Sequence, residues 1–90
     1  MALITTRAFT LDYDAQGDVL YVFFTAPQPA LSLEVEPDIL LRYVPPSLDV
    51  VGMTFLNFLT HFPGSDPETA IERATAVVDD IVRKYPKIPL

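Results

Sequence analysis

Residues 18–24, which read DVLYVFF, constrain the fold of this chain more than any other stretch. Side chains of a β-strand point alternately to its two faces, and here both sets are apolar. One set is Val19, Tyr21 and Phe23, and the opposite set is Leu20, Val22 and Phe24. A strand that is apolar on both faces is covered on both sides. The chain has 90 residues and forms one domain at most, so the cover for both faces must be found within a small structure or in a second chain.

Four further segments have the composition of strands. Residues 7–14 (RAFTLDYD) and 30–36 (ALSLEVE) alternate apolar and polar side chains, which is the period of a half-buried strand. Residues 38–44 (DILLRYV) and 50–58 (VVGMTFLNF) complete a set of about five. Five prolines fall between these runs, where a missing N–H does not interrupt a sheet: Pro27, Pro29, Pro37, Pro45 and Pro46.

After residue 58 the pattern changes to a loop and then a helix. Asp66 is placed to cap a helix with Pro67 at its first position, and Ser65 with Glu68 is the competing cap. Apolar side chains then recur at helical spacing, at Ile71, Ala74, Val78, Ile81, Val82 and Tyr85. We therefore predict an α+β domain: an antiparallel meander of four or five strands within about 7–58, a loop over 59–66, and one C-terminal helix over about 67–84 packed on one face of the sheet.

The charge balance restricts the classes of partner. Six Lys and Arg side chains stand against twelve Asp and Glu, which gives a net charge of −6 and disfavours nucleic acids and anionic membranes. The chain has no cysteine, so disulfides and thiolate metal sites are excluded. It has no apolar run long enough to span a membrane, and its first residues do not resemble a signal peptide, so we expect a cytoplasmic protein. No cofactor is implied.

The stretch DYDAQGD, residues 12–18, partly matches a calcium-binding loop. Such a loop closes with a bidentate Glu at its twelfth position, but the twelfth residue counted from Asp12 is Phe23, and strands rather than helices flank the stretch. A hairpin turn is the better interpretation, with Gly17 at positive φ and with Asp14 and Asp18 bonding turn amides. We predict no metal site; the alternative is a weak cation held by Asp12, Asp14 and Asp18.

Few other side chains suggest chemistry. His61 is the only histidine, and as a general base it would need an orienting partner and a nucleophile nearby. Glu34 and Glu36 share the outer face of a strand, which usually means a solvated face, and Arg42 is placed to pair with one of them across a hairpin. The three glycines are too scattered for a phosphate-binding loop. No catalytic residue is predicted.

Within YDAQGDVLYVFF, the residues Tyr13-Asp14, Asp18 and Leu20-Tyr21-Val22 resemble the opening signature of a small bacterial family known as domain of unknown function 2283. That signature reads Tyr-Asp, three residues, then Asp-x-Leu-Tyr-Ile. The later EVEPDILLRY and VVGMTF are similar to the second half of the family, so that the resemblance covers about residues 9–58. This chain departs from the family at Gln16-Gly17, where the family has an acidic residue and Ala, and at Pro45-Pro46-Ser47, where it has an Asp/Gly-rich turn.

The resemblance implies a small sheet without an established activity. Some family members resemble genes that stand beside small toxin-like ribonuclease folds, which implies a partner-binding, antitoxin-like role. Our first functional hypothesis is therefore a non-enzymatic interaction or regulatory module. The alternative is a small acid–base or hydrolytic enzyme that uses His61 with nearby carboxylates. A module that binds a small apolar molecule lies between the two.

We also predict a homodimer from the two apolar faces of residues 18–24. One helix covers only one face of a five-stranded sheet, which leaves Leu20, Val22 and Phe24, or their opposite set, without cover. We take Leu20, Val22 and Phe24 as the candidate apolar interface. The alternative is that residues 25–30 or the loop 59–65 fold over that face.

Overall fold

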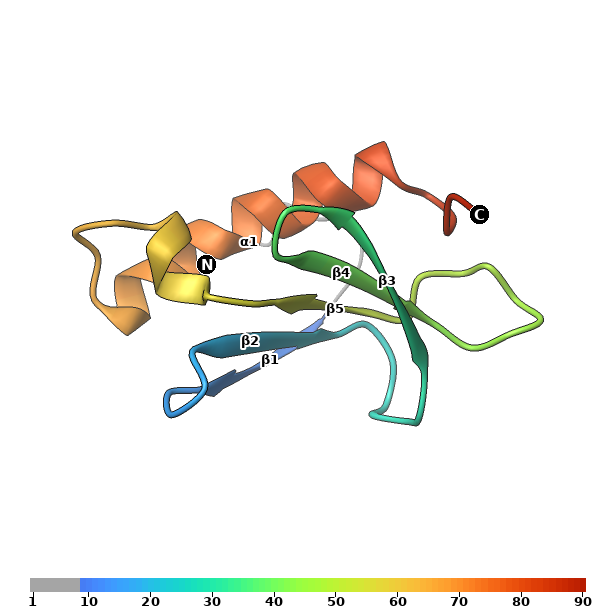
Figure 1. The fold of residues 1–90 in the computed structure, drawn as a ribbon, viewed down its shortest axis with the longest axis horizontal. Coiled ribbons are helices and arrows are strands. Elements are labelled where there is room, and N and C mark those ends of the chain that lie inside the picture. The colour runs from blue at the N-terminus through green and yellow to red at the C-terminus, as the bar shows by residue number, and fades with distance from the viewer. Residues whose placement is uncertain (1–8) are drawn as a thin grey trace.

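The computed structural model describes residues 9–90, which form a five-stranded antiparallel sheet with one long helix on it (Figure 1). The elements in chain order are β1 Thr10–Asp14, β2 Val19–Phe23, β3 Leu31–Glu36, β4 Ile39–Tyr43, β5 Gly52–Phe55, the short 3-10 helix η1 Phe58–His61, and α1 Pro67–Lys84. The predicted α+β class is confirmed. Residues 7 and 8, where the first strand was predicted to begin, lie outside the described residues.

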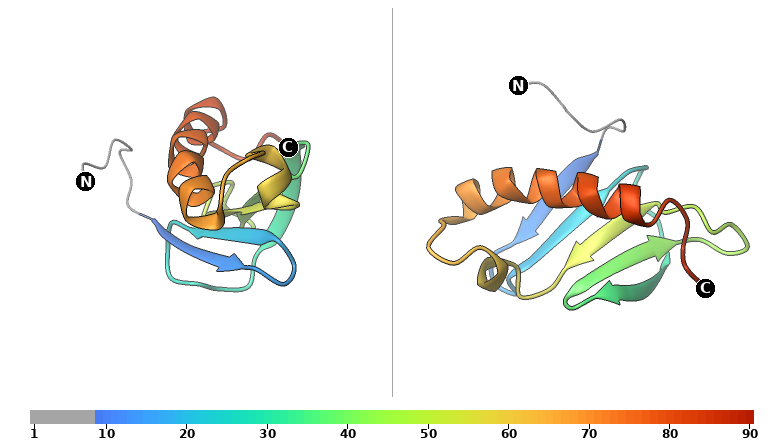
Figure 2. Two further views of the ribbon diagram at one scale, coloured as in Figure 1. Left: turned by 90° about the vertical axis from the view of Figure 1, so that its left-hand side faces the viewer. Right: turned by 90° about the horizontal axis from the view of Figure 1, so that it is seen from above.

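The order of the strands corrects one detail of the prediction. The sheet runs β1-β2-β5-β4-β3, so it consists of two hairpins with β5 inserted between them rather than a sequential meander. The reason lies in the composition of β5, all four of whose residues are buried, since such a strand gains most in the centre of a sheet. The connection from β2 to β3 passes the end of the sheet, on the side away from α1 (Figures 1 and 2).

The helix begins and ends where its capping residues stand. Asp66 is the N-cap, its carboxylate accepts a hydrogen bond from the Thr69 N–H at 2.8 Å, and Pro67 follows at the first turn. This hydrogen bond lowers the pKa of the Asp66 carboxyl below its ordinary value. Asp79 and Arg83, four positions apart on the helix, form an ion pair at 2.6 Å. None of the described helices has the length and apolar character needed to cross a bilayer.

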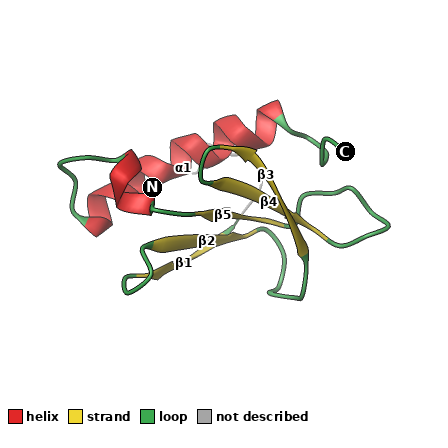
Figure 3. Cartoon of the chain, viewed as in Figure 1, coloured by secondary structure: helices red, strands yellow, loops and turns green. Residues whose placement is uncertain are grey.

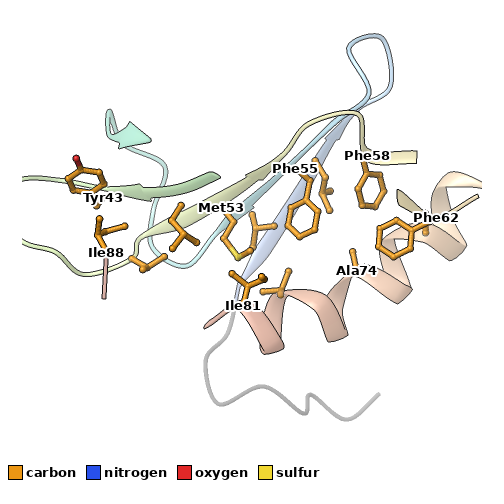
Figure 4. Close-up of a cluster of buried hydrophobic side chains, with 14 residues drawn as sticks. Tyr43, Met53, Phe55, Phe58, Phe62, Ala74, Ile81 and Ile88 are labelled. Carbon is orange, nitrogen blue, oxygen red and sulfur yellow. The ribbon is translucent and has the colours of Figure 1, made fainter. Parts of the chain in front are cut away.

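The core lies between α1 and one face of the sheet (Figures 3 and 4). Leu20, Val22, Leu41 and Met53 are fully buried there, and Phe55 is nearly so. The helix contributes Ala70, Ala74, Val78 and Ile81. Ala70 was absent from the predicted stripe, which began one residue later at Ile71. Beyond the helix, Ile88 packs back into the core, and its N–H donates to the Leu48 carbonyl at 2.8 Å.

The end of α1 is fastened to the edge strand β3. Lys84 Nζ lies 2.6 Å from Glu36 Oε2, and the Tyr85 hydroxyl donates to the same oxygen at 3.2 Å. Lys84 therefore connects the helix to β3 through an ion pair. The cross-strand pair predicted for Arg42 is not formed. Arg42 lies opposite Ser32, and it forms no ion pair with a described residue.

The Glu36 contacts predict a dependence of stability on pH. The hydrogen bond from Lys84 lowers the pKa of the Glu36 carboxyl below 4.5. A lowered pKa means that this contribution is complete above the pKa of the unfolded chain and is lost as the pH falls through the folded value. Between about pH 6 and about pH 3, the melting temperature of the wild type should fall further than that of Glu36→Gln. Thermal melts followed by circular dichroism measure this, and parallel curves for the two proteins would contradict it.

Candidate functional site

The stretch DYDAQGD forms the hairpin turn between β1 and β2, as predicted. Asp14 Oδ1 accepts hydrogen bonds from the Gln16 and Gly17 N–H groups at 3.1 and 3.2 Å. The left-handed residue is Asp18, with φ 56°, and not Gly17 as expected. Aspartate tolerates this conformation because its short polar side chain can form local hydrogen bonds. Among residues 9–90, no group of three or more His, Asp or Glu side chains is arranged to hold a metal ion.

The Asp18 carboxylate does not bond turn amides but connects three parts of the chain. Its Oδ1 accepts a hydrogen bond from the Tyr13 hydroxyl at 2.8 Å. The Leu59 N–H, at the start of η1, donates to both carboxylate oxygens at 3.1 and 3.2 Å. The Asp18 carbonyl accepts from the Phe58 N–H at 2.9 Å. Asp18 thus fastens the segment after β5 to the first hairpin and caps η1 from outside, since Asn57 makes no side-chain cap.

These contacts also act on Tyr13. The hydrogen bond to Asp18 and burial raise the pKa of the Tyr13 hydroxyl above 10.0, and the charges of Asp18 and Asp14 add to the effect. The Tyr13 ring packs against Phe58 with centroids 5.6 Å apart. Tyr13 and Asp18 therefore have a structural role that accounts for both residues.

Replacing Asp18 with alanine should lower the free energy of unfolding by about 2 kcal/mol, because the charged acceptor of two donors is lost. Asp18→Asn should cost less, since asparagine keeps one acceptor oxygen and tolerates positive φ. Asp14→Ala, which removes an exposed acceptor of two turn amides, is the matched control and should cost the least. Urea denaturation followed by circular dichroism gives the three values. Equal losses for Asp18→Ala and Asp14→Ala would contradict the role of Asp18.

A second aspartate holds the same segment from the other hairpin. Asp38, in the β3–β4 turn at φ 66°, accepts a hydrogen bond from the Leu56 N–H through its carbonyl at 2.8 Å. Its carboxylate contacts Asn57 Nδ2 at 3.4 Å and His61 Nε2 at 3.0 Å. The two hairpin turns therefore both form hydrogen bonds with the segment that follows β5.

The His61–Asp38 contact supplies one part of a catalytic site. A carboxylate that accepts from Nε2–H would orient the imidazole and leave Nδ1 as a base. The pair is open to solvent, with 37% and 32% of the two side chains exposed. The nearby Thr60 hydroxyl already donates to the Asn57 carbonyl at 2.6 Å. Two polar residues that follow His61 in the sequence have other partners: Ser65 accepts a hydrogen bond from Arg73, and Asp66 caps α1.

The face of the sheet turned away from α1 is the other candidate site, and we call it the open face. It carries Val19, Tyr21 and Phe23 from β2, Gly52 and Thr54 from β5, and Leu40 and Arg42 from β4. The Tyr21 and Phe23 rings stack with centroids 6.4 Å apart. Val19, Tyr21, Phe23 and Leu40 are partly exposed although apolar.

The predicted interface of Leu20, Val22 and Phe24 does not lie on the open face. Leu20 and Val22 are fully buried beneath α1, and Phe24 packs beside the core with its ring 6.1 Å from that of Phe9. These three residues are therefore not an exposed interface, and the opposite set lies on the open face. Local sequence did not decide this because both sets are apolar. The decision depends on which face matches the buried residues of the neighbouring strands, such as Met53 and Leu41.

Two hollows lie at the end of the sheet where β2 ends and β3 begins. One, of about 350 Å³, is lined by Phe9, Thr10, Phe23, Phe24, Thr25, Ala26 and Pro27. The other, of about 250 Å³, is lined by Pro29, Ala30, Leu31, Val44 and Pro45. His61 lines neither of them. Residues 25–27 and 29–30 thus line hollows at the end of the sheet.

The chain matches a known protein family. The model of a family described as a protein of unknown function (DUF2283) matches residues 10–58, which is more than half of the chain. The matched part holds all five strands and the contacts of Tyr13 with Asp18, and it ends before α1. This match confirms the resemblance found in the sequence. No curated protein and no solved structure matches the chain.

Proposed function

The chain belongs to the DUF2283 family of proteins of unknown function, and from this premise we propose that it is a non-enzymatic interaction or regulatory module that binds another protein chain through its open face. The observation that carries the proposal is that four apolar side chains on that face are partly exposed: Val19, Tyr21, Phe23 and Leu40. Contiguous exposed apolar patches on a protein surface often mark sites where another protein binds.

The composition of the face supports protein as the class of partner. The face carries two aromatic rings on β2 and a leucine and an arginine on β4, and aromatic residues and arginine are enriched at protein interfaces. The net charge of −6 disfavours a polyanion. The antitoxin-like role implied by the resemblance belongs to the same class, and a second copy of the chain is the simplest partner of all.

The test is affinity capture of the tagged chain from its native host with three versions of the protein. The wild type and Ala76→Arg, which changes an exposed position on α1, should retain one stable protein partner. Tyr21→Arg should lose it, because a charge then stands in the centre of the open face. The partner is then purified and its affinity measured by calorimetry with each variant. Retention of the same affinity by Tyr21→Arg would refute the proposal, and so would the absence of any partner.

A second candidate, an acid–base or hydrolytic enzyme, is favoured by the single contact between His61 and Asp38 at 3.0 Å. It predicts that the purified chain hydrolyses a simple activated ester and that His61→Ala and Asp38→Asn both abolish this activity. A wild type without hydrolysis above the buffer rate, or a rate unchanged in His61→Ala, would end this candidate.

A further inference from the structure

The open face has a relief of large and small side chains that follows from the strand register. In one cross-strand row, Tyr21 pairs with Thr54 and Thr54 with Leu40. In the next row, Phe23 pairs with Gly52 and Gly52 with Arg42. Thr54 is only 9% exposed, and Gly52 is buried. The central strand β5 therefore contributes only small side chains to this face, between the aromatic side chains of β2 and the longer side chains of β4.

The open face also carries two residues of opposite charge, Arg42 and Asp12. Arg42 on β4 and Asp12 on β1 form no ion pair with any residue in the described range 9–90. They point to the same side of the sheet but stand three strands apart, which is roughly 14 Å at about 4.8 Å per strand, too far for contact within one chain.

We propose that the open face binds a second copy of this chain, with the two-fold axis parallel to the strands and between β2 and β5. The inference rests on the proposed function, because it names the occupant of the same surface. This axis lays β2 of each copy over β5 of the other and β4 over β1. Tyr21 then lies over Thr54 of the second copy and Phe23 over its Gly52, so that the large rings of each copy face the small residues of the other. The two sheets pack about 10 Å apart.

The same placement brings the two charges together. When β4 lies over β1 of the second copy, Arg42 faces Thr10 of that copy and stands diagonally from its Asp12, within reach of a long arginine side chain. Two-fold symmetry makes this contact twice. The helices α1 lie on the two outer surfaces and take no part.

The obvious alternative axis, directly beneath β5, is disfavoured by size and by charge. It would place Gly52 on Gly52 of the second copy, so that small residues rather than large rings face each other at the axis. It would also place β1 over β3 and so Asp12 against Glu34, which puts like charges face to face. The offset axis avoids both conflicts, since β3 with its Glu34 then extends beyond the edge of the second sheet.

The experiment is sedimentation of the purified chain with charge-reversal variants. The 10.0 kDa wild type should sediment as a dimer at micromolar concentration. Asp12→Arg and Arg42→Glu should each weaken dimerisation by about tenfold or more, because like charges then face across the interface, and the double variant should recover most of the affinity. Asp80→Arg, which makes the same change of charge on the exposed side of α1, should have no effect. Circular dichroism shows that each variant retains the fold.

A wild type that remains monomeric at a concentration of about 100 μM overturns the inference. So does a dimer that is indifferent to the single reversals, or a double variant whose loss is the sum of the two. If the chain is a monomer but Tyr21→Arg still loses a captured protein, the dimer is refuted and the proposed function stands. If the charge exchange restores the dimer but no other protein is captured, the second copy is the partner.

Discussion

Replacing Phe58 with alanine should lower the free energy of unfolding by about 4 kcal/mol, the typical cost of removing a fully buried aromatic ring. Phe58 is fully buried, and its ring contacts those of Tyr13, Phe55 and Phe62 at centroid distances of 5.6, 6.0 and 5.2 Å. It is the residue at which the first hairpin, the central strand and the start of η1 meet (Figure 4).

Such a loss would remove a large share of the roughly 5–15 kcal/mol that stabilises a small domain. Urea denaturation followed by far-ultraviolet circular dichroism measures it. Phe58→Leu is the control that keeps most of the apolar volume, and it should cost about 1.5 kcal/mol or less. A loss below about 1 kcal/mol for Phe58→Ala would mean that the ring does not hold these elements together.

Replacing Gly52 with alanine should have the second-largest effect. A Cβ at this position would stand 2.6 Å from the Val22 carbonyl oxygen, a contact that real side chains do not make. The obstacle is the backbone of the neighbouring strand, so relief requires β2 and β5 to move apart in the centre of the sheet. We expect a cost of about 3 kcal/mol, at the upper end of the range for overpacking.

Gly17→Ala is the matched control for this substitution. Its added Cβ would meet Asp14 Oδ2 at 3.0 Å, the end of a side chain that can turn aside. It should therefore cost much less than Gly52→Ala in the same denaturation experiment. Equal costs would show that the approach of β5 to β2 is looser than described.

The helix was predictable because its signals are local. Asp66, Pro67 and the basic residues Arg83 and Lys84 lie within the helix or beside it, and they set its two ends correctly. The strand order was not predictable, because pairing of β5 with β2 joins residues about thirty positions apart, and periodicity carries no information on such pairs.

The contacts of Asp18 and His61 could not be predicted from the sequence, for the same reason. The acceptors of Asp18 bind the Leu59 N–H, which is 41 positions away, so a turn was the only interpretation that its neighbourhood offered. The contact between Asp38 and His61 joins residues 23 positions apart, so it could not be predicted from local sequence either. One signal was available in the signature itself, since a tyrosine five residues before an aspartate allows a hydroxyl–carboxylate contact across a hairpin.

The central place of β5 has a consequence for the order in which the chain is made. β5 is the last strand to leave the ribosome, yet it supplies a neighbour to both β2 and β4. Until residue 55 has emerged, the nascent chain holds two separate hairpins, and a lone hairpin is at best marginally stable in water. Both hairpins then present an unpaired edge, at β2 and at β4, to any other strand nearby. Synthesis therefore passes through an interval in which strands of different molecules compete for these edges, and only the arrival of β5 ends that competition within one chain.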